Sequence, residues 1–228
     1  MTIASRINSI RQQLPESVRL IAVTKQVPTD AIREAYEAGI RDFGESKVQE
    51  TAEKQSQLQD LPDINWHLIG HLQANKAAKA LEHFQWIHSL DNLKLAQRLS
   101  RLAGEQSCSP EVCLQVKMLP DPDKFGWSVP ELLADLPELN KCQHIKIQGL
   151  MTIPPLGLDD SQILELFNST RELADKIDRQ NLPRIQMQQL SMGMSGDYHL
   201  AIQAGATMVR LGTSLFGSRR GQLGLKIE

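Results

Sequence analysis

The stretch Leu20-Ile21-Ala22-Val23-Thr24-Lys25-Gln26-Val27-Pro28 carries the first strong structural signal in the chain. Its apolar, β-branched residues predict a buried strand over 20–26, and Pro28 indicates where the strand ends. The period of two then places Ile21, Val23 and Lys25 on one face. At the edge of a buried core the amine of Lys25 would be partly desolvated, so it would lose its proton readily and could attack a carbonyl. The alternative is a lysine that simply ends a strand and points into water.

Outward from this stretch, short apolar runs alternate with helical patterns, which is typical of βαβ units around a parallel sheet. We predict strands near 20–26, 40–45, 64–70, 86–90, 111–118, 145–153, 187–191 and 207–211. We predict helices near 29–38, 47–58, 75–82, 92–103, 129–135, 160–180 and 197–204, after an amphipathic N-terminal helix.

Eight such repeats in 228 residues fit a (β/α)8 (TIM) barrel with an extra N-terminal helix. An open doubly wound sheet is the competing fold, but no Gly-x-Gly-x-x-Gly turn follows the first strand. No linker or composition shift divides the chain, so we expect one domain over 1–228.

One irregular stretch, 119–127, contains two prolines and a glycine, which forbid a continuous helix or strand. We expect a mobile loop that acts as a lid or docking surface over the barrel mouth. Lys124 lies either over that mouth or in solvent.

The composition excludes several classes of protein. Lys+Arg 25 against Asp+Glu 27, without a block of like charge, shows no footprint for nucleic acid or membrane. The three cysteines lack metal-type spacing and indicate reduced thiols and a cytoplasmic protein. We find no signal peptide and no membrane span.

In barrels, the loops after strands seven and eight often bind a phosphate. Here these loops are Ser191-Met192-Gly193-Met194-Ser195-Gly196-Asp197 and Arg210-Leu211-Gly212-Thr213-Ser214. Their glycines permit close approach, and their hydroxyl and N–H groups suit an anion. Each loop alone could be an ordinary helix start. Together with Lys25 they match the needs of pyridoxal 5′-phosphate (PLP).

Six motifs make the resemblance to a known family explicit. They are Ala22-Val23-Thr24-Lys25, the stretch 43–50 (FGESKVQE), the stretch 66–76 (WHLIGHLQANK), Gly149-Leu150-Met151-Thr152-Ile153-Pro154, Leu190-Ser191-Met192-Gly193-Met194-Ser195, and Arg210-Leu211-Gly212-Thr213. Running nearly from end to end, they resemble the successive motifs of the YggS/PROSC family of PLP-binding homeostasis proteins. That resemblance implies a barrel like the N-terminal domain of alanine racemase.

The resemblance also implies roles for individual residues. Lys25 would form a Schiff base with PLP, and Arg210 would face its pyridine nitrogen. Ser195, Gly212, Thr213 and the backbone of Gly193 and Met194 would hold the phosphate. Ser46 stands where the family commonly has asparagine, so its contact to the phenolic oxygen is shortened or lost. Met151 would line the pocket, although an apolar strand residue is a core residue by default.

The remaining aromatic side chains suggest no metal centre. His67 and His71 lie four apart, which on a strand puts both on one face, but no further ligand is suitably spaced. We expect structural or pocket-lining roles for them, and no metal. His83, His88, His144 and His199 show no pairing. Trp66, Trp86 and Trp127 are expected to pack in the core.

Arg210 argues against catalysis. A guanidinium only donates, so it would leave the pyridine nitrogen unprotonated and weaken the electron sink that amino-acid chemistry uses. Fold-type III alanine racemases accept such an arginine but add a tyrosine from a second domain. Tyr36 and Tyr198 fall in helical patterns, and Tyr198 near the phosphate loop keeps the racemase alternative open.

We therefore expect a non-catalytic carrier or regulator of PLP, in vitamin B6 and amino-acid homeostasis as the resemblance implies. Expected partners are PLP and apoenzymes or a regulatory protein, with the chain itself a monomer. The alternatives are a fold-type III racemase and a class I aldolase, in which a barrel lysine attacks the substrate itself.

Overall fold

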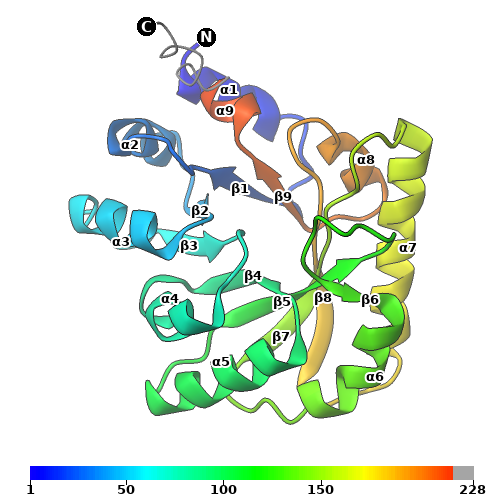
Figure 1. Cartoon of the computed structure of the whole chain (residues 1–228). Coiled ribbons are helices and arrows are strands. Elements are labelled where there is room, and N and C mark those ends of the chain that lie inside the picture. Colours follow the sequence, from blue (N-terminus) through cyan, green and yellow to red (C-terminus); the bar gives the residue numbers. More distant parts are fainter. Residues whose placement is uncertain (218–228) are drawn as a thin grey trace, which may run out of the picture.

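Eight parallel strands close into a barrel in the computed structural model, which describes residues 1–217 (Figure 1). The strands are β1 (Arg19–Val23), β2 (Asp42–Glu45), β3 (Asn65–Leu68), β4 (Trp86–Leu90), β5 (Glu111–Lys117), β7 (Lys146–Met151), β8 (Ile185–Ser191) and β9 (Met208–Leu211). Pairings of β4 with β5 and of β1 with β9 complete the ring. The prediction of a TIM barrel is therefore confirmed. A two-residue strand, β6 (Trp127–Ser128), pairs with β5 outside the ring.

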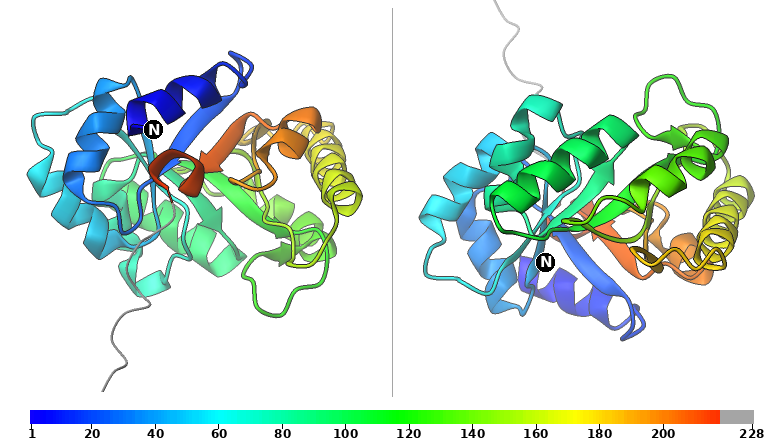
Figure 2. Two further views of the ribbon diagram at one scale, coloured as in Figure 1. Left: turned by 90° about the horizontal axis from the view of Figure 1, so that it is seen from above. Right: turned by 90° about the horizontal axis from the view of Figure 1, so that it is seen from below.

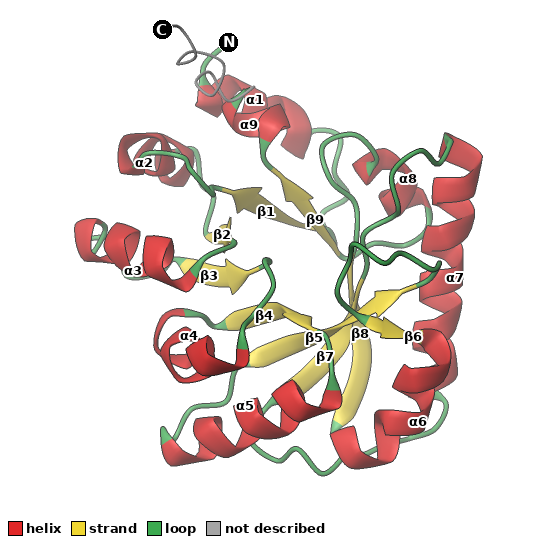
Figure 3. Cartoon of the chain, in the orientation of Figure 1, coloured by secondary structure: helices red, strands yellow, loops and turns green. Residues whose placement is uncertain are grey.

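Helices surround the strands (Figure 3). They are α1 (Ile3–Arg11), α2 (Thr29–Glu37), α3 (Val48–Gln57), η1 (Ala74–Lys76), α4 (Ala77–His83), α5 (Leu93–Glu105), α6 (Val129–Leu139), α7 (Asp160–Asp178), α8 (Tyr198–Gln203) and α9 (Thr213–Phe216). The N-terminal helix α1 lies beside α9, where Arg6 donates to the Leu215 carbonyl at 3.3 Å. In the described part of the chain, no helix combines the length and apolar character that crossing a membrane requires.

Several element ends differ from the predictions, and two differences matter here. Strand β1 ends at Val23, because Gln26 takes a left-handed φ of 60° and the chain turns. Lys25 consequently lies in the turn just beyond the strand. Helix α6 continues through Pro137 to Leu139, four residues past its predicted end, because Leu136 and Leu139 bury its last turn.

The irregular stretch after β5 is shorter than predicted. Trp127 pairs with β5 and is buried, and its indole N–H donates to Asp135 at 2.8 Å. The loop before it projects from the body in both views of Figure 2. Lys124 does not point freely into solvent, because it donates to the carbonyl of Pro154 at 2.5 Å and pairs with Asp121.

The barrel has two buried layers. The larger layer lies between strands and helices and contains most of the apolar side chains, Ala22 among them. The smaller one lies inside the barrel and groups Ile21 with Trp86, Cys113, Met151 and Met208. The predicted alternation along β1 is thus confirmed for Ile21 and Ala22. The inner layer has few apolar residues, because polar side chains occupy much of the interior.

Candidate cofactor site

The structure brings all the predicted site residues to the carboxyl-terminal half of the barrel. Because every ring pairing is parallel, the strands end at one common rim. Lys25 follows β1, Ser46 follows β2, Met151 ends β7, Gly193, Met194 and Ser195 follow β8, and Gly212 and Thr213 follow Arg210 on β9. What each of them binds remains a prediction.

A charged cluster holds the backbone on both sides of Lys25. We call Thr24, Glu45, Glu50 and Lys54 the Lys54 cluster. Lys54 Nζ donates to the Thr24 carbonyl at 2.6 Å and to Glu45 and Glu50 at 2.7 Å each. The Thr24 hydroxyl donates to Glu45 at 2.7 Å, and the backbone N–H of Gln26 donates to Glu50 at 2.5 Å. The residues before and after Lys25 are therefore fixed by one cluster.

Burial governs the electrostatics of this cluster. Glu45 is fully buried, and desolvation raises its pKa even though Lys54 and Thr24 act to lower it. Burial also acts to raise the pKa of Glu50, but hydrogen bonds from Lys54 and Gln26 outweigh it and leave the pKa lowered. Glu45 Oε2 is buried without a hydrogen-bond partner among residues 1–217. Sequence reasoning missed Lys54, since a lysine within a polar helix looks solvated.

The two glycine-containing loops meet at Ser195. Its hydroxyl oxygen lies 3.4 Å from the backbone nitrogen of Gly212 and 3.4 Å from that of Ser214, which donate to it. Gly193 has a φ of 92°, and a Cβ there would lie 2.6 Å from that of Ala201, so only glycine fits. Hydroxyl and N–H groups of both loops thus converge in the arrangement that anions favour. Ser214 was not among the predicted residues.

The other residues of the two glycine-containing loops do not direct hydrogen-bond donors toward Ser195. The Met194 N–H donates to the Asp197 carboxylate at 2.5 Å, which shapes the turn and already satisfies that group. The Gly193 carbonyl accepts from the Arg210 N–H at 3.0 Å. Thr213 is exposed at the start of α9.

The loop after β9 lies against the end of β1. Ala22 is in register with Leu211, and a Cβ on Gly212 would lie 3.4 Å from the Val23 carbonyl oxygen. The converging donors and the Lys25 turn are therefore neighbours across the β1–β9 seam, as a ligand with an aldehyde and a phosphate would need.

Arg210 is a buried cation at the side of this site. Its NH1 donates to Ser191 Oγ at 2.7 Å and its NH2 to the Thr152 carbonyl at 3.1 Å. Burial lowers its pKa to about 10, which still leaves the guanidinium charged at neutral pH. Met151, beside Thr152, packs in the inner layer, as is usual for an apolar residue of a barrel strand.

The histidine predictions need correction. Strand β3 ends at Leu68, so His67 and His71 do not share a face of it. His67 is buried and pairs with His88, whereas His71 bonds Asp91 and stacks on Phe125. His83 and His88 show no pairing in the sequence but have partners in the structure: His83 pairs with Gln55, and His88 with Ser191 as well as His67. These contacts join residues that are far apart in the sequence, so the spacing of neighbouring residues does not predict them.

The described residues contain neither a metal site nor a tyrosine directed to Lys25. Over residues 1–217, no group of three or more His, Cys, Asp or Glu side chains is placed to hold a metal. The Tyr36 hydroxyl bonds Asp63 on the outer surface. Tyr198 bonds Gln13 at 3.1 Å, outside the barrel, so neither hydroxyl is directed to the Lys25 turn.

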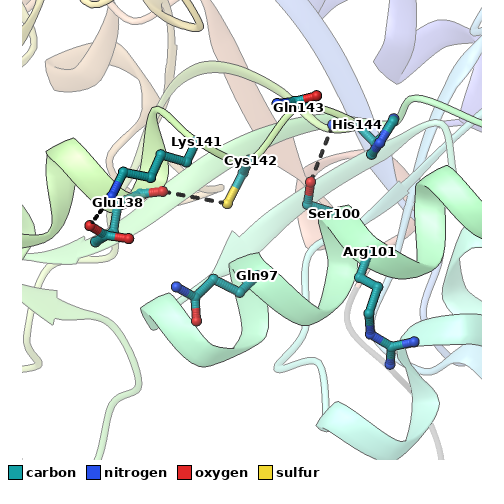
Figure 4. A pocket seen from close by; sticks show the side chains of 8 residues that line it. All are labelled: Gln97, Ser100, Arg101, Glu138, Lys141, Cys142, Gln143 and His144. Carbon is teal, nitrogen blue, oxygen red and sulfur yellow. Dashed lines mark hydrogen bonds and ion pairs between the residues drawn. The ribbon is translucent and has the colours of Figure 1, made fainter.

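Two further hollows lie on the surface of the described residues. Ser46 lines one of about 500 Å³ together with exposed lysines that include Lys47, which precedes α3, and Lys79 on α4. A second, of about 290 Å³, lies between α5 and the segment before β7 (Figure 4). Its lysine, Lys141, is paired with Glu138. Neither combines an amine with converging anion donors.

The fold and the site define the class of this protein. The family model described as "Alanine racemase, N-terminal domain" matches residues 1–220. An alanine racemase from Clostridium difficile, 17% identical, superposes with a TM-score of 0.77 over 97% of this chain and 60% of that chain, a likeness in fold alone.

Nearer relatives narrow the class. The Pyridoxal phosphate homeostasis protein of Synechocystis sp. is 52% identical over 90% of this chain and 94% of its own length. PipY of Synechococcus elongatus, solved with PLP bound, is 54% identical, covers 95% of this chain and 100% of its own, and has a TM-score of 0.91. The chain belongs to the family of pyridoxal phosphate homeostasis proteins.

Proposed function

We propose that this protein binds PLP covalently through the Lys25 amine and serves PLP homeostasis without being an enzyme. The observation that carries the proposal is the convergence of Ser195, Gly212 and Ser214 beside the Lys25 turn. A relative in which PLP was found, 54% identical across nearly the whole chain, supports it. When bound, PLP supplies a reactive aldehyde and an electron-withdrawing ring.

The residues present fit this cofactor. Gly193 and Gly212 leave the room for close approach that a phosphate needs, and Ser195 adds a hydroxyl. The Lys54 cluster holds the turn that carries Lys25. Arg210 would donate to the ring nitrogen and would leave that nitrogen unprotonated. Ser46 and Met151 are the residues that we propose for contacts at the ring.

Two features favour a carrier over a racemase. A donor at the ring nitrogen weakens the electron sink, and the hydroxyls of Tyr36 and Tyr198 are engaged outside the barrel. We propose a single-domain monomer that exchanges PLP with apoenzymes or a regulatory protein. The unpaired thiols of Cys108, Cys113 and Cys142 support a cytoplasmic location.

The test is the visible absorption spectrum of protein purified with PLP, followed by borohydride reduction and peptide mass analysis. We expect a band and a reduced adduct on Lys25, and loss of both in Lys25→Ala but not in Lys79→Ala, which changes an exposed lysine. A protein that is trapped only with a sugar phosphate would instead be an aldolase.

Catalysis and delivery need separate measurements. Uptake of solvent deuterium at the α-carbon of an amino acid, at enzyme-like rates, would contradict the non-catalytic role. Loss of the band when a PLP-dependent apoenzyme is added would establish delivery, and persistence of the band would restrict the role to storage or signalling.

A further inference from the structure

A line of hydrogen bonds crosses the barrel interior and ends on Arg210. We call Asp42, His67, His88, Ser191 and Arg210 the interior relay. Asp42 Oδ1 lies 2.9 Å from His67 Nε2, and His67 Nδ1 lies 2.9 Å from His88 Nε2. His88 Nδ1 lies 2.7 Å from Ser191 Oγ, which lies 2.7 Å from Arg210 NH1. His67, His88 and Ser191 are fully buried.

The two ends of the relay allow only one direction of donation. A guanidinium has no acceptor, so Arg210 donates to Ser191, and a carboxylate has no hydrogen, so Asp42 accepts from His67. A neutral imidazole carries one hydrogen, and both rings must then carry it on Nε2. Ser191 in turn donates to His88, and His88 donates to His67. Every hydrogen-bonding group along the line is satisfied in this arrangement.

The relay links opposite charges that do not touch. Within the described residues, Arg210 has no carboxylate at ion-pair distance, and the only arginine or lysine at that distance from Asp42 is Arg19, at 3.9 Å. Desolvation lowers the pKa of His67, and for His88 the desolvation is reinforced by His67, Arg210 and Arg19. The imidazoles are therefore neutral connectors. Asp42 begins β2 and is partly exposed, whereas Arg210, on β9, is buried.

We propose that Asp42, His67, His88 and Ser191 are positioning residues that orient the Arg210 guanidinium toward the ring nitrogen of the cofactor. The proposal rests on the function proposed above. With NH1 anchored on Ser191 and NH2 on the Thr152 carbonyl, the guanidinium plane is fixed, so its remaining hydrogens keep one direction. Since the relay is polarised toward Asp42, Ser191 presents only its oxygen to Arg210.

The first test uses protein without PLP. Two-bond 15N–1H correlation spectra report which imidazole nitrogen carries the hydrogen. We expect His67 and His88 to stay neutral and Nε2-protonated over about pH 5 to 8, the range in which an ordinary imidazole titrates. His199, which is exposed and lies outside the relay, serves as the internal comparison in the same spectra. Mixed tautomers or a charged ring in the relay would overturn the proposal.

The second test interrupts the relay with Ser191→Ala, which removes one hydroxyl and changes the core less than replacing His67 or His88 would. In the cofactor-free variant we expect the His88 tautomer signal to shift. In the loaded variant we expect PLP affinity to fall about tenfold, corresponding to the loss of one hydrogen bond to a charged group. The pH midpoint of the absorption band should move as well.

Two further variants separate positioning from folding. Ser191→Thr keeps the hydroxyl and should restore both the tautomer signal and the band. Ser100→Ala removes another buried serine, outside the relay, and should leave both unchanged. If Ser191→Ala changes neither readout, the relay does not position Arg210. If the unmodified protein forms no band on Lys25, the proposed function fails, and the tautomer spectra still decide whether the relay exists.

Discussion

The Lys54 cluster and the interior relay are both buried and polar, but their opposite charges are arranged differently. In the Lys54 cluster, opposite charges touch: Lys54 Nζ lies 2.7 Å from each of two carboxylates. In the relay, the charges of Asp42 and Arg210 are separated by three neutral groups. The first fixes the backbone around Lys25, and the second reaches a side chain, Arg210.

This difference determines how much stability each network loses when one of its members is replaced. A direct ion pair that loses one partner leaves a buried charge uncompensated, which is among the most destabilising single changes. A chain of neutral hydrogen bonds that is cut leaves unpaired polar atoms but no new net charge, and the loss is smaller. Stability measurements should therefore respond to the cluster, and ligand measurements to the relay.

The largest effect is expected from Lys54→Met. It leaves Glu45 fully buried with no cation, and we expect a loss of about 3 to 5 kcal/mol in the free energy of unfolding, measured in urea. Adding Glu45→Gln should restore part of the loss, whereas Lys79→Met on the surface should cost less than about 0.5 kcal/mol. A loss as small as that of the surface control would show that Glu45 is not held as an anion by Lys54.

A smaller loss is expected from His88→Leu. It leaves the Ser191 hydroxyl and His67 Nδ1 without their partners, which costs about 1 to 3 kcal/mol. His199→Leu is the matched control, because His199 is exposed. If His88→Leu destabilises as strongly as Lys54→Met, the relay carries a charge at its centre and the contrast between the networks breaks down.

Glu45 and the two histidines of the relay should also have opposite pH dependence. The pKa values of His67 and His88 are lowered in the folded state, so the unfolded chain binds more protons below the ordinary value of 6.5. Stability should therefore decrease as pH falls from 6.5, by at most about 1.4 kcal/mol per pH unit for each ring. The raised pKa of Glu45 acts the other way: its contribution is complete below 4.5 and is lost as pH rises through the folded pKa.

Urea midpoints measured from about pH 5 to 8, the range of imidazole titration, separate these contributions. His88→Leu should flatten the acid side of the profile, because one proton-linked group is removed. His199→Leu provides the comparison. An unchanged slope in His88→Leu would mean that this ring binds protons equally in the folded and the unfolded chain, so that folding does not lower its pKa.

The smallest effect concerns Cys113, which lies in the inner layer beside the relay. Burial raises its pKa to about 12, so no thiolate is available for reaction at pH 8. A disulfide reagent should label the half-buried Cys108 first and Cys113 only after unfolding. Cys108→Ser should remove the fast phase. Fast labelling of Cys113 in that variant would show that water enters the barrel interior readily.

Much of the fold was predictable because the signals are local. The apolar runs mark all eight barrel strands, and the period of two places Ile21 inside and Ala22 outside. The ends of elements were less predictable, as at Gln26 and Pro137, since backbone turns and burial of a last helical turn decide them. The two glycine loops were predictable as a pair because barrel topology brings successive strand ends together.

The polar networks were not predictable in this way. Lys54 lies nine residues from Glu45 but on another element, and His88 is 103 residues from Ser191. Such pairs have no periodicity, and each side chain alone has an ordinary surface or core interpretation. Ser214 was missed for a related reason: its N–H, and not its side chain, bonds Ser195.

The sequence by itself determined the barrel, the position of Lys25 near a strand end and the family, because these depend on local apolar periodicity and on motifs that are contiguous in the chain. Only the tertiary structure decided that Lys25 lies in a turn held by Lys54, and that Arg210 is bonded across the interior toward Asp42. The physical reason is that a hydrogen bond depends on distances of about 3 Å between atoms. Only closure of the barrel brings atoms from distant strands that near.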